Sequence, residues 1–212
     1  SVDAFAGFDL AHAAGNLKMS LHDWGIDFGV WCTYKYLNSG PGGSSGAFIH
    51  ERHANNPDLP RFAGWWGHDE GERFLMDKKF KPMQGAAGWQ LSNAQILPMA
   101  VHKASLEIFE RAGIDNLRAK SELLTGYLEF LIHELNGAQS EEKIRIITPQ
   151  NPEERGCQLS LVFNKNGKEI HKKLTEQGVI SDWREPDVIR IAPVPLYNSF
   201  EDVFRFCQIV KE

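Results

Sequence analysis

Asp9 and Lys35 have the side chains whose types and spacing best suit chemistry on an amino acid. Each follows a short apolar stretch, and His12 and Tyr34 stand close to them in the chain. If the two stretches are parallel strands, Asp9 and Lys35 lie at one carboxyl edge of a sheet, where α/β proteins bind ligands. The lysine could then form a Schiff base with pyridoxal phosphate, while the carboxylate keeps the ring nitrogen protonated. Both could equally be ordinary residues at strand ends, and spacing alone leaves that choice open.

Arg190 lies between two isoleucines in the apolar segment VIRIAPVP. A guanidinium group there suits two-point binding of a substrate carboxylate. An outward-facing arginine on an edge strand fits the same pattern. Trp65 and Trp66 in GWWGHDE pose a similar choice, because tryptophan side chains are costly to leave exposed. They either fill a core or stack on a flat ligand.

Three polar features invite a binding assignment but favour a simpler interpretation. The glycine-rich loop at residues 39–46 could offer backbone N–H groups to a phosphate, but no Gly-Lys-Ser/Thr follows it, and a plain turn is favoured. His50, His53 and the run His68-Asp69-Glu70 could be considered as metal ligands, yet no H-E-x-x-H occurs. We expect these histidines to be exposed to solvent and predict no metal site.

Apolar periodicity indicates the elements that must position these residues. Two buried strands, a third strand beginning at AFIH and two helices are expected, at residues 4–10, 26–33, 47–50, 99–111 and 115–136. Gly113 is expected to end the first helix. Residues 51–98 are irregular, and such a long irregular segment in a compact protein is usually functional.

From residue 144 onward, short strands alternate with two amphipathic helices. The segments IRIIT, CQLSLVF, VISDW and VIRIAP are typical of strands, and Ser199-Phe200-Glu201-Asp202 resembles a capping box that opens the last helix. This arrangement indicates a compact α+β unit. We therefore expect two domains, at residues 1–110 and 111–212, with the boundary in the helical region at roughly 99–140.

Composition limits the class of protein. Of the 212 residues, 42% are hydrophobic and 24% charged, which is enough for a core and excludes a disordered chain. The sequence has no apolar run long enough for a membrane span, and its net charge of −5 argues against nucleic acid as a partner. Three cysteines without a C-x-x-C pair argue against a disulfide scaffold or zinc ribbon and favour a reducing, cytoplasmic location.

Six segments together resemble the kynureninase family, in that family's order along essentially the whole chain. They are GFDLAHAAGN, WCTYKYLNSGPGGSSGAFIHERH, GWWGHDE, GWQLSNAQI, EERGCQLS and RIAPVPLYNSFEDV. The resemblance implies an α/β fold, the type I fold of pyridoxal-phosphate-dependent transferases. The chain would hold the C-terminal part of the large domain, with a mixed, mostly parallel sheet, followed by the small α+β C-terminal domain.

The resemblance also implies roles for the matching positions. Lys35 would bind pyridoxal 5'-phosphate covalently, and Tyr34 would contact the phosphate and help to move protons, so both would be catalytic. Asp9 would pair with the pyridine nitrogen. Other positions would contact the cofactor or the substrate: His12, Trp65 and Asn93 the cofactor, Ser92 and Arg190 the substrate.

Kynureninases are homodimers that hydrolyse the small molecules L-kynurenine or 3-hydroxy-L-kynurenine to anthranilate or 3-hydroxyanthranilate plus L-alanine. The reaction belongs to tryptophan catabolism and NAD synthesis. Ser92 and Asn93 resemble the pocket of eukaryote-like members, which hints at the 3-hydroxy substrate. Members of the family are considerably longer than this chain. We therefore expect a preceding segment or companion chain with the N-terminal half, and expect the 212 residues alone to bind the cofactor poorly.

Two alternatives stay open at this point. One is another type I enzyme, such as a cysteine desulfurase or a class V aminotransferase. A desulfurase needs a mobile catalytic cysteine, whereas Cys157 begins a predicted strand and Cys207 lies on a predicted helix. The other is a non-catalytic subunit that keeps the fold, although such a subunit would be free to lose Lys35, Asp9 and Tyr34.

Overall fold

The computed structural model describes residues 4–137 and 142–211. The chain divides into two compact units, Ser1–Arg111 and Ala112–Glu212, and each is described by itself. Within the described ranges, no helix combines the length and the apolar character that crossing a membrane requires.

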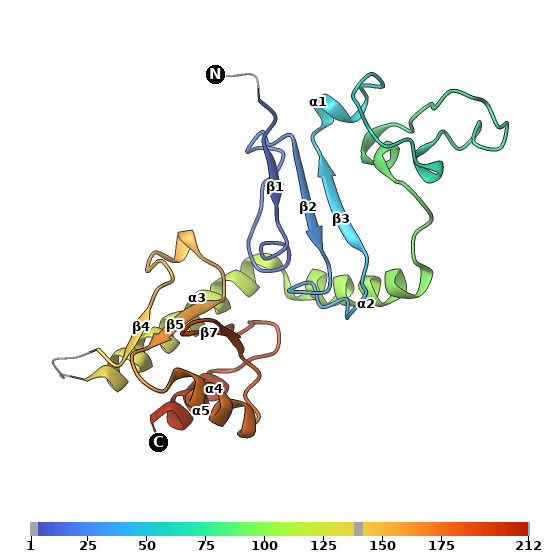
Figure 1. The fold of residues 1–212 in the computed structure, drawn as a ribbon. Coiled ribbons are helices and arrows are strands. Elements are labelled where there is room, and N and C mark those ends of the chain that lie inside the picture. The colour runs from blue at the N-terminus through green and yellow to red at the C-terminus, as the bar shows by residue number, and fades with distance from the viewer. Residues whose placement is uncertain (1–3, 138–141, 212) are drawn as a thin grey trace. The chain divides into compact units, whose positions relative to one another are not determined.

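The first unit is built on a sheet of three strands, β1 (Gly7–Asp9), β2 (Phe28–Cys32) and β3 (Ser45–Ile49), which lie side by side in that order (Figure 1). β1 and β2 are parallel, with Asp9 opposite Val30, whereas β2 and β3 are antiparallel. The sequence left open whether the strands before Asp9 and Lys35 are parallel. They are, so β1 and β2 end at the same edge of the sheet.

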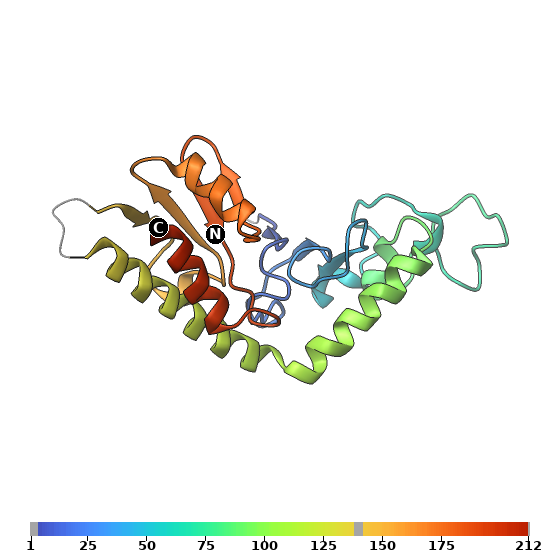
Figure 2. The same cartoon turned by 90° about the horizontal axis from the view of Figure 1, so that it is seen from below.

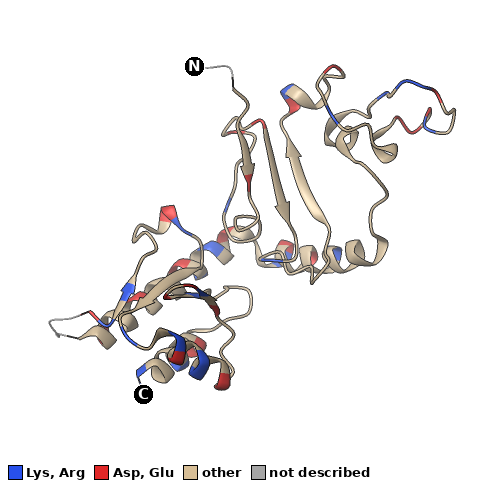
Figure 3. Ribbon diagram, in the orientation of Figure 1, with Lys and Arg blue, Asp and Glu red and all other residues tan. Residues whose placement is uncertain are grey.

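The expectation that both strands are buried is wrong for β1 and holds only in part for β2. All three residues of β1 are exposed, and Phe8 and Val30 keep 49% and 47% of their surface accessible. Asp9 is the one charged residue in the three strands, so the rest of the sheet appears uncoloured in Figure 3. Apolar composition correctly predicted strands here, but the described residues do not supply the layers that would cover them.

The segment after β3 is irregular, as expected, with one short helix and two 3-10 turns before a long helix. These are α1 (Glu51–Ala54), η1 (Trp65–Gly67), η2 (Gly85–Trp89) and α2 (Ile96–Ala112). α2 begins three residues before the predicted start, because Pro98 falls in the first turn, where no N–H donor is needed. The Ser105 hydroxyl of α2 donates to the Leu37 carbonyl, which fixes α2 near the end of β2 (Figures 1 and 2).

Gly113 separates α2 from α3 (Ile114–Asn136), as the sequence predicts, and its φ of 76° is one that glycine adopts without strain. The second unit then forms an antiparallel sheet in the order β4-β5-β7-β6. Its elements are β4 (Ile144–Ile146), η3 (Pro152–Glu154), β5 (Leu159–Phe163), α4 (Gly167–Glu176), β6 (Asp182–Arg184), β7 (Val188–Ile191) and α5 (Phe200–Lys211).

One face of this second sheet packs against the helices and forms a closed apolar core. Leu159, Leu161 and Ile189 are fully buried there against Leu124 and Leu128 of α3. α5 lies beside α3, as Figures 1 and 2 both show. Because side chains alternate along a strand, the residues between these core positions lie on the opposite face of the sheet.

Candidate functional site

The carboxyl edge shared by β1 and β2 carries the first predicted group of site residues. Asp9 ends β1 with an exposed side chain, and its Oδ1 accepts the Ala11 N–H at 2.9 Å. The chain then turns, since the N–H groups of Ala13 and Ala14 both donate to the Leu10 carbonyl. His12 lies in this turn, with its ring edge-on to Tyr36 at 6.0 Å between centroids.

Lys35 and Tyr34 lie in a tight turn directly after β2. The Asn38 N–H donates to the Lys35 carbonyl at 3.0 Å, and the Ser39 N–H donates to the Thr33 carbonyl at 3.1 Å. The Lys35 ammonium lies 6.0 Å from the centroid of the Tyr34 ring. A hydrogen bond with the Cys32 thiol raises the pKa of the exposed Tyr34 phenol above its usual value.

Two buried hydroxyl groups hold this turn closed. Thr33 Oγ1 donates to the Ser44 carbonyl, so the Ser39 hydroxyl, 2.5 Å away, is the donor to Thr33. A Cβ atom on Gly43 would collide with Ser39 Oγ, so glycine is required at that position. The Ser39 hydroxyl thus points inward, and the glycine-rich loop acts as a support for Lys35.

Trp65, Ser92 and Asn93 lie in the irregular segment that follows β3. Trp65 is 43% exposed and meets Phe74 edge-on at 5.5 Å. Its turn, η1, packs on η2, which packs on α1 at the end of β3. Figure 1 shows this segment away from the edge where β1 and β2 end. Ser92 and Asn93 are exposed in the connection between η2 and α2. The chain therefore does not by itself bring Trp65 to Lys35.

Trp66 neither fills a core nor lies open to a flat ligand, the two environments that the sequence left possible. Its ring is partly covered, and the Arg73 guanidinium stacks on it at 4.6 Å from the ring centroid. Arg73 itself is buried and donates to the carbonyls of Trp66 and His68. This stacking fixes the GWWGHDE turn, which leaves Trp65 directed outward.

The expectation that His50 and His53 are exposed is wrong. His50 is buried, accepts the Arg52 N–H through Nδ1 and stacks on His22 at 4.8 Å between centroids. His53 Nε2 lies 2.6 Å from Asp27 Oδ1. The buried Asp27 explains the difference for His53, because its charge needs partners. His50 instead donates its backbone N–H to the Asp27 carbonyl. The one available signal was a charged residue at the head of the apolar run IDFGVWC.

Asp27 ties the amino end of β2 to its surroundings. Its Oδ2 accepts the Ala6 N–H at 2.6 Å, and its Oδ1 pairs with both His53 and Arg52. These partners hold the pKa of the Asp27 carboxyl well below its usual range, with the Ala6 N–H as the largest cause. In the described ranges, no group of three or more His, Cys, Asp or Glu side chains is arranged to hold a metal ion.

Arg190 lies on β7 in the second unit, and the structure shows a partner that the sequence interpretation missed. Asp182, directly opposite on β6, accepts the Arg190 Nε–H at 2.5 Å. The Arg190 side chain remains 26% exposed. A hairpin whose two antiparallel strands are joined by three residues could have indicated this pairing, because directly opposite charges commonly pair.

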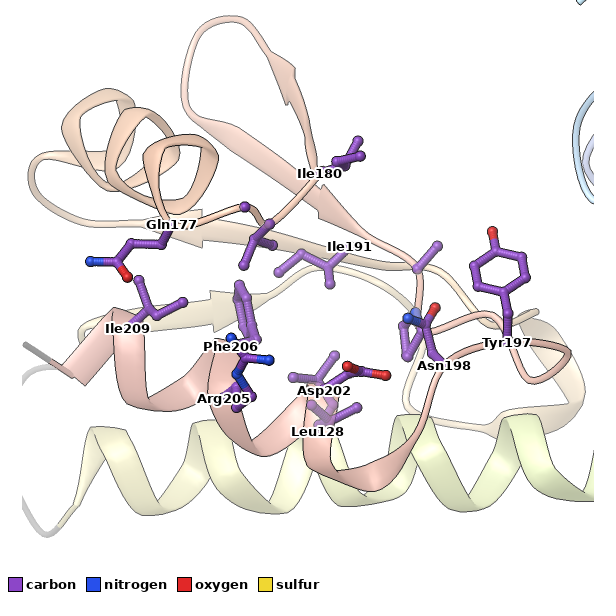
Figure 4. Close-up of a pocket in the computed structure, with 15 residues that line it drawn as sticks. Leu128, Gln177, Ile180, Ile191, Tyr197, Asn198, Asp202, Arg205, Phe206 and Ile209 are labelled. Atoms are coloured by element: carbon purple, nitrogen blue, oxygen red, sulfur yellow. The ribbon is translucent and has the colours of Figure 1, made fainter.

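A separate pocket of about 430 Å³ also lies in the second unit (Figure 4). Apolar side chains of β7 and α5 such as Ile191, Phe206 and Ile209 form part of its wall, with Asp202 and Arg205 beside them. Ile191 follows Arg190 on the strand and therefore points to the other face of the sheet. None of the predicted site residues lines this pocket.

Comparisons with known proteins agree on family and fold. The family model for the kynureninase C-terminal domain matches residues 117–210. A kynureninase from Flavobacterium johnsoniae is 56% identical over 209 residues, which cover 99% of this chain and 49% of that relative. The chain thus spans about half the length of the curated relatives that it matches.

Two solved structures show the fold. The cysteine desulfurase CsdA from Escherichia coli matches with a TM-score of 0.73 at 16% identity, over 95% of this chain and 49% of CsdA. A C-DES variant with glycine covalently linked to its PLP cofactor matches with a TM-score of 0.65 at 17% identity, over 94% of this chain and 49% of C-DES. The expected type I fold of pyridoxal-phosphate-dependent enzymes is confirmed. The domain match and the identity to curated relatives place this chain in the kynureninase family.

Proposed function

We propose that this chain supplies the Lys35 half of a kynureninase, which hydrolyses L-kynurenine or its 3-hydroxy form to anthranilate or 3-hydroxyanthranilate and L-alanine. The observation that carries the proposal is the parallel pairing of β1 and β2. It puts the Asp9 carboxylate and the Lys35 amine at one edge of a sheet. The kynureninase relatives add the choice of substrate.

The donor set at this edge fits pyridoxal phosphate. Lys35 offers an amine to the aldehyde, and Asp9 offers a carboxylate to the pyridine N–H. Tyr34 offers a phenol to the phosphate from the same turn as Lys35, and His12 follows Asp9 by one turn of chain. When bound, the cofactor would supply an electron sink for bonds at the substrate α-carbon.

The side chains of the chain have distinct tasks in this proposal. The Ala11 N–H holds one oxygen of Asp9, which leaves its other oxygen for the cofactor ring. Lys35 would carry a proton to and from the substrate α-carbon. Tyr34, a phenol that is protonated at neutral pH, would donate a proton later in the reaction. Arg190 would bind the substrate α-carboxylate through its guanidinium.

The remaining predicted contacts require a second copy of the chain. Trp65 lies away from Lys35 within one copy, so its indole and the Asn93 amide would reach the cofactor of the partner, with Ser92 lining the substrate pocket. We therefore propose a homodimer. Since none of the three cysteines forms a disulfide, we also assign the enzyme to the cytoplasm. Its similarity to kynureninases supports a place in tryptophan catabolism and NAD synthesis.

Exposed apolar strands support the proposal that a further segment completes the first unit. Phe8 and Val30 expose apolar surface on strands that carry almost no charge. Patches of this kind mark surfaces that bind other protein. We propose that the missing cover corresponds to the other half of the relatives, and that residues 1–110 and 111–212 are the large-domain portion and the small domain.

A cysteine desulfurase is disfavoured by its thiol requirement. Cys157 and Cys207 are buried, and burial raises the pKa of the Cys207 thiol to about 12. Neither could act as an accessible nucleophile at neutral pH. Cys32 is half-buried in β2, a rigid position unsuited to a mobile nucleophile.

The proposal is tested by completing the enzyme. The completed enzyme is this chain joined to the other half of the Flavobacterium johnsoniae kynureninase. With pyridoxal phosphate, it should release L-alanine from kynurenine, and Lys35→Ala should abolish release, whereas Lys18→Ala should not. Release that persists in Lys35→Ala would contradict the assignment of Lys35.

A further inference from the structure

β6 and β7 bring one aspartate and two arginines together on the face of the second sheet opposite the apolar core. Asp182 and Arg190 are direct partners in the strand register. Their neighbours Trp183 and Ile189 point to the core instead. The polar cluster is therefore a feature of one face of one hairpin, and both strands fix it.

One oxygen of Asp182 serves both arginines. Asp182 Oδ2 accepts from Arg190 Nε at 2.5 Å and also pairs with Arg190 Nη2. The Arg184 Nε lies 3.0 Å from the same oxygen. Two guanidinium groups thus share one carboxylate, so the cluster keeps a net positive charge. Among the described residues, no other carboxylate lies within ion-pair distance of Arg190.

Asp182 occupies one edge of the Arg190 guanidinium, and this determines which N–H donors remain for a ligand. A guanidinium has five N–H donors arranged in a plane. Asp182 takes the side formed by Nε and Nη2, which leaves the end formed by Nη1 and Nη2. That end can bind a second carboxylate through two parallel hydrogen bonds. Since Arg190 is 26% exposed, a small ligand can reach it.

We propose that Asp182 is a positioning residue, which orients Arg190 so that its free end meets the α-carboxylate of the amino-acid substrate. Arg184 shares the charge of Asp182 and so keeps it from neutralising Arg190. The inference rests on the proposed function, which gives Arg190 its ligand. Without Asp182, the long arginine side chain must be ordered by the substrate itself, and that ordering weakens binding.

The completed enzyme tests this through the split between KM and kcat. Asp182→Ala should raise the KM for kynurenine about tenfold and leave kcat within about twofold. The reason is that the contact with Arg190 is weakened equally in the bound substrate and in the transition state. Asp182→Asn keeps an acceptor oxygen and should restore most of the affinity. The control is Asp187→Ala, a matched change in the turn between β6 and β7. It should leave KM unchanged.

Several results would overturn the inference. A KM that is unchanged or lower in Asp182→Ala would mean that Asp182 does not orient Arg190 or that it competes with the substrate. A loss that Asp182→Asn does not reduce would also count against it, as would a fall in kcat alone.

A second measurement separates this inference from the proposed function. If the parent completed enzyme released no alanine, the proposed function would fail, and the NMR signal of the Arg190 Nε–H would still report the orientation. We expect a slowly exchanging signal in the 212-residue chain that Asp182→Ala removes and Asp182→Asn keeps. An unchanged signal in Asp182→Ala would rule the positioning role out.

Discussion

Asp27 shows how one carboxylate can organise the end of a sheet opposite the end that leads to Lys35. It binds the Ala6 N–H just before β1 and pairs with His53 and Arg52 at α1. The carboxylate form is favoured by all three partners, which lowers the pKa of Asp27 in the folded state. The cluster therefore contributes to stability, and its contribution depends on pH.

The sign of that dependence follows from the lowered pKa. A carboxyl group of this kind stabilises the fold above its unfolded pKa of about 3.9, and the contribution is lost as pH falls below that value. We expect protection of the Ala6 amide against hydrogen exchange to decline in that acid range. Asp27→Asn should remove the protection already at neutral pH, whereas Asp58→Asn should not. Equal protection in both variants would contradict this role.

The cysteines provide a second test at the residue scale. Burial raises the pKa of Cys207 to about 12, and Cys157 has no exposed surface. A reagent that alkylates cysteine thiolates should therefore modify Cys32 first at pH 8, and the other two cysteines only after unfolding. The measurement is the mass of labelled peptides with and without urea. Rapid native labelling of Cys207 would contradict the buried position and reopen the desulfurase alternative.

The turn that carries Lys35 depends on the buried hydroxyl pair of Thr33 and Ser39. Thr33→Val keeps the shape but leaves the Ser44 carbonyl and the Ser39 hydroxyl unpaired, which typically costs about 1–3 kcal/mol. We expect faster amide exchange at Ser39, with Thr33→Ser as the control that keeps the hydroxyl. Identical exchange in the two variants would show that the hydroxyl does not hold the turn.

The start of α5 is a capping box, as the sequence predicts. The Asp202 N–H donates to Ser199 Oγ at 3.2 Å, and the Ser199 N–H donates to Asp202 Oδ2 at 2.8 Å. Ser199→Ala should lower the free energy of unfolding by about 1 kcal/mol, measured by urea denaturation. Glu201→Gln, in the same first turn but outside the box, should change it far less. An equal effect of both changes would contradict a specific capping role for the Ser199 hydroxyl.

Local elements were predictable because they depend on local chemistry. Apolar periodicity located the strands and helices, and Gly113 marked the break between α2 and α3. The exposure of β1 and β2 was not predictable, because the burial of a strand depends on which other elements cover the sheet and not on the strand's own residues. The same is true of His50, whose burial depends on Asp27 and on a stacking partner, His22, far away in the chain.

At the scale of the molecule, the two units differ in how completely they bury their apolar residues. The second has a closed core, whereas the first leaves side chains such as Phe5, Phe8 and Ile96 exposed. The sequence indicated the order of the site residues, and the pairing of β1 with β2 gave Asp9 and Lys35 a common edge. It could not indicate that Trp65 lies elsewhere, since that depends on the path of an irregular segment.

The exposed surface leads to a prediction about the chain alone. A dye that binds exposed apolar surface should fluoresce strongly with the 212-residue chain, and the signal per chain should fall in the completed enzyme. The physical reason is that the added segment covers the strands of the first unit. Equal fluorescence in the two samples would argue against such a cover.

Trapping the cofactor on the enzyme shows whether Lys35 and Asp9 form one cofactor site. The completed enzyme is mixed with pyridoxal phosphate, reduced with borohydride and digested, and the modified peptide is identified by mass spectrometry. We predict modification at Lys35, sharply reduced in Asp9→Ala and unchanged in Asp58→Ala. Modification spread over exposed lysines such as Lys18, with none enriched at Lys35, would contradict the account.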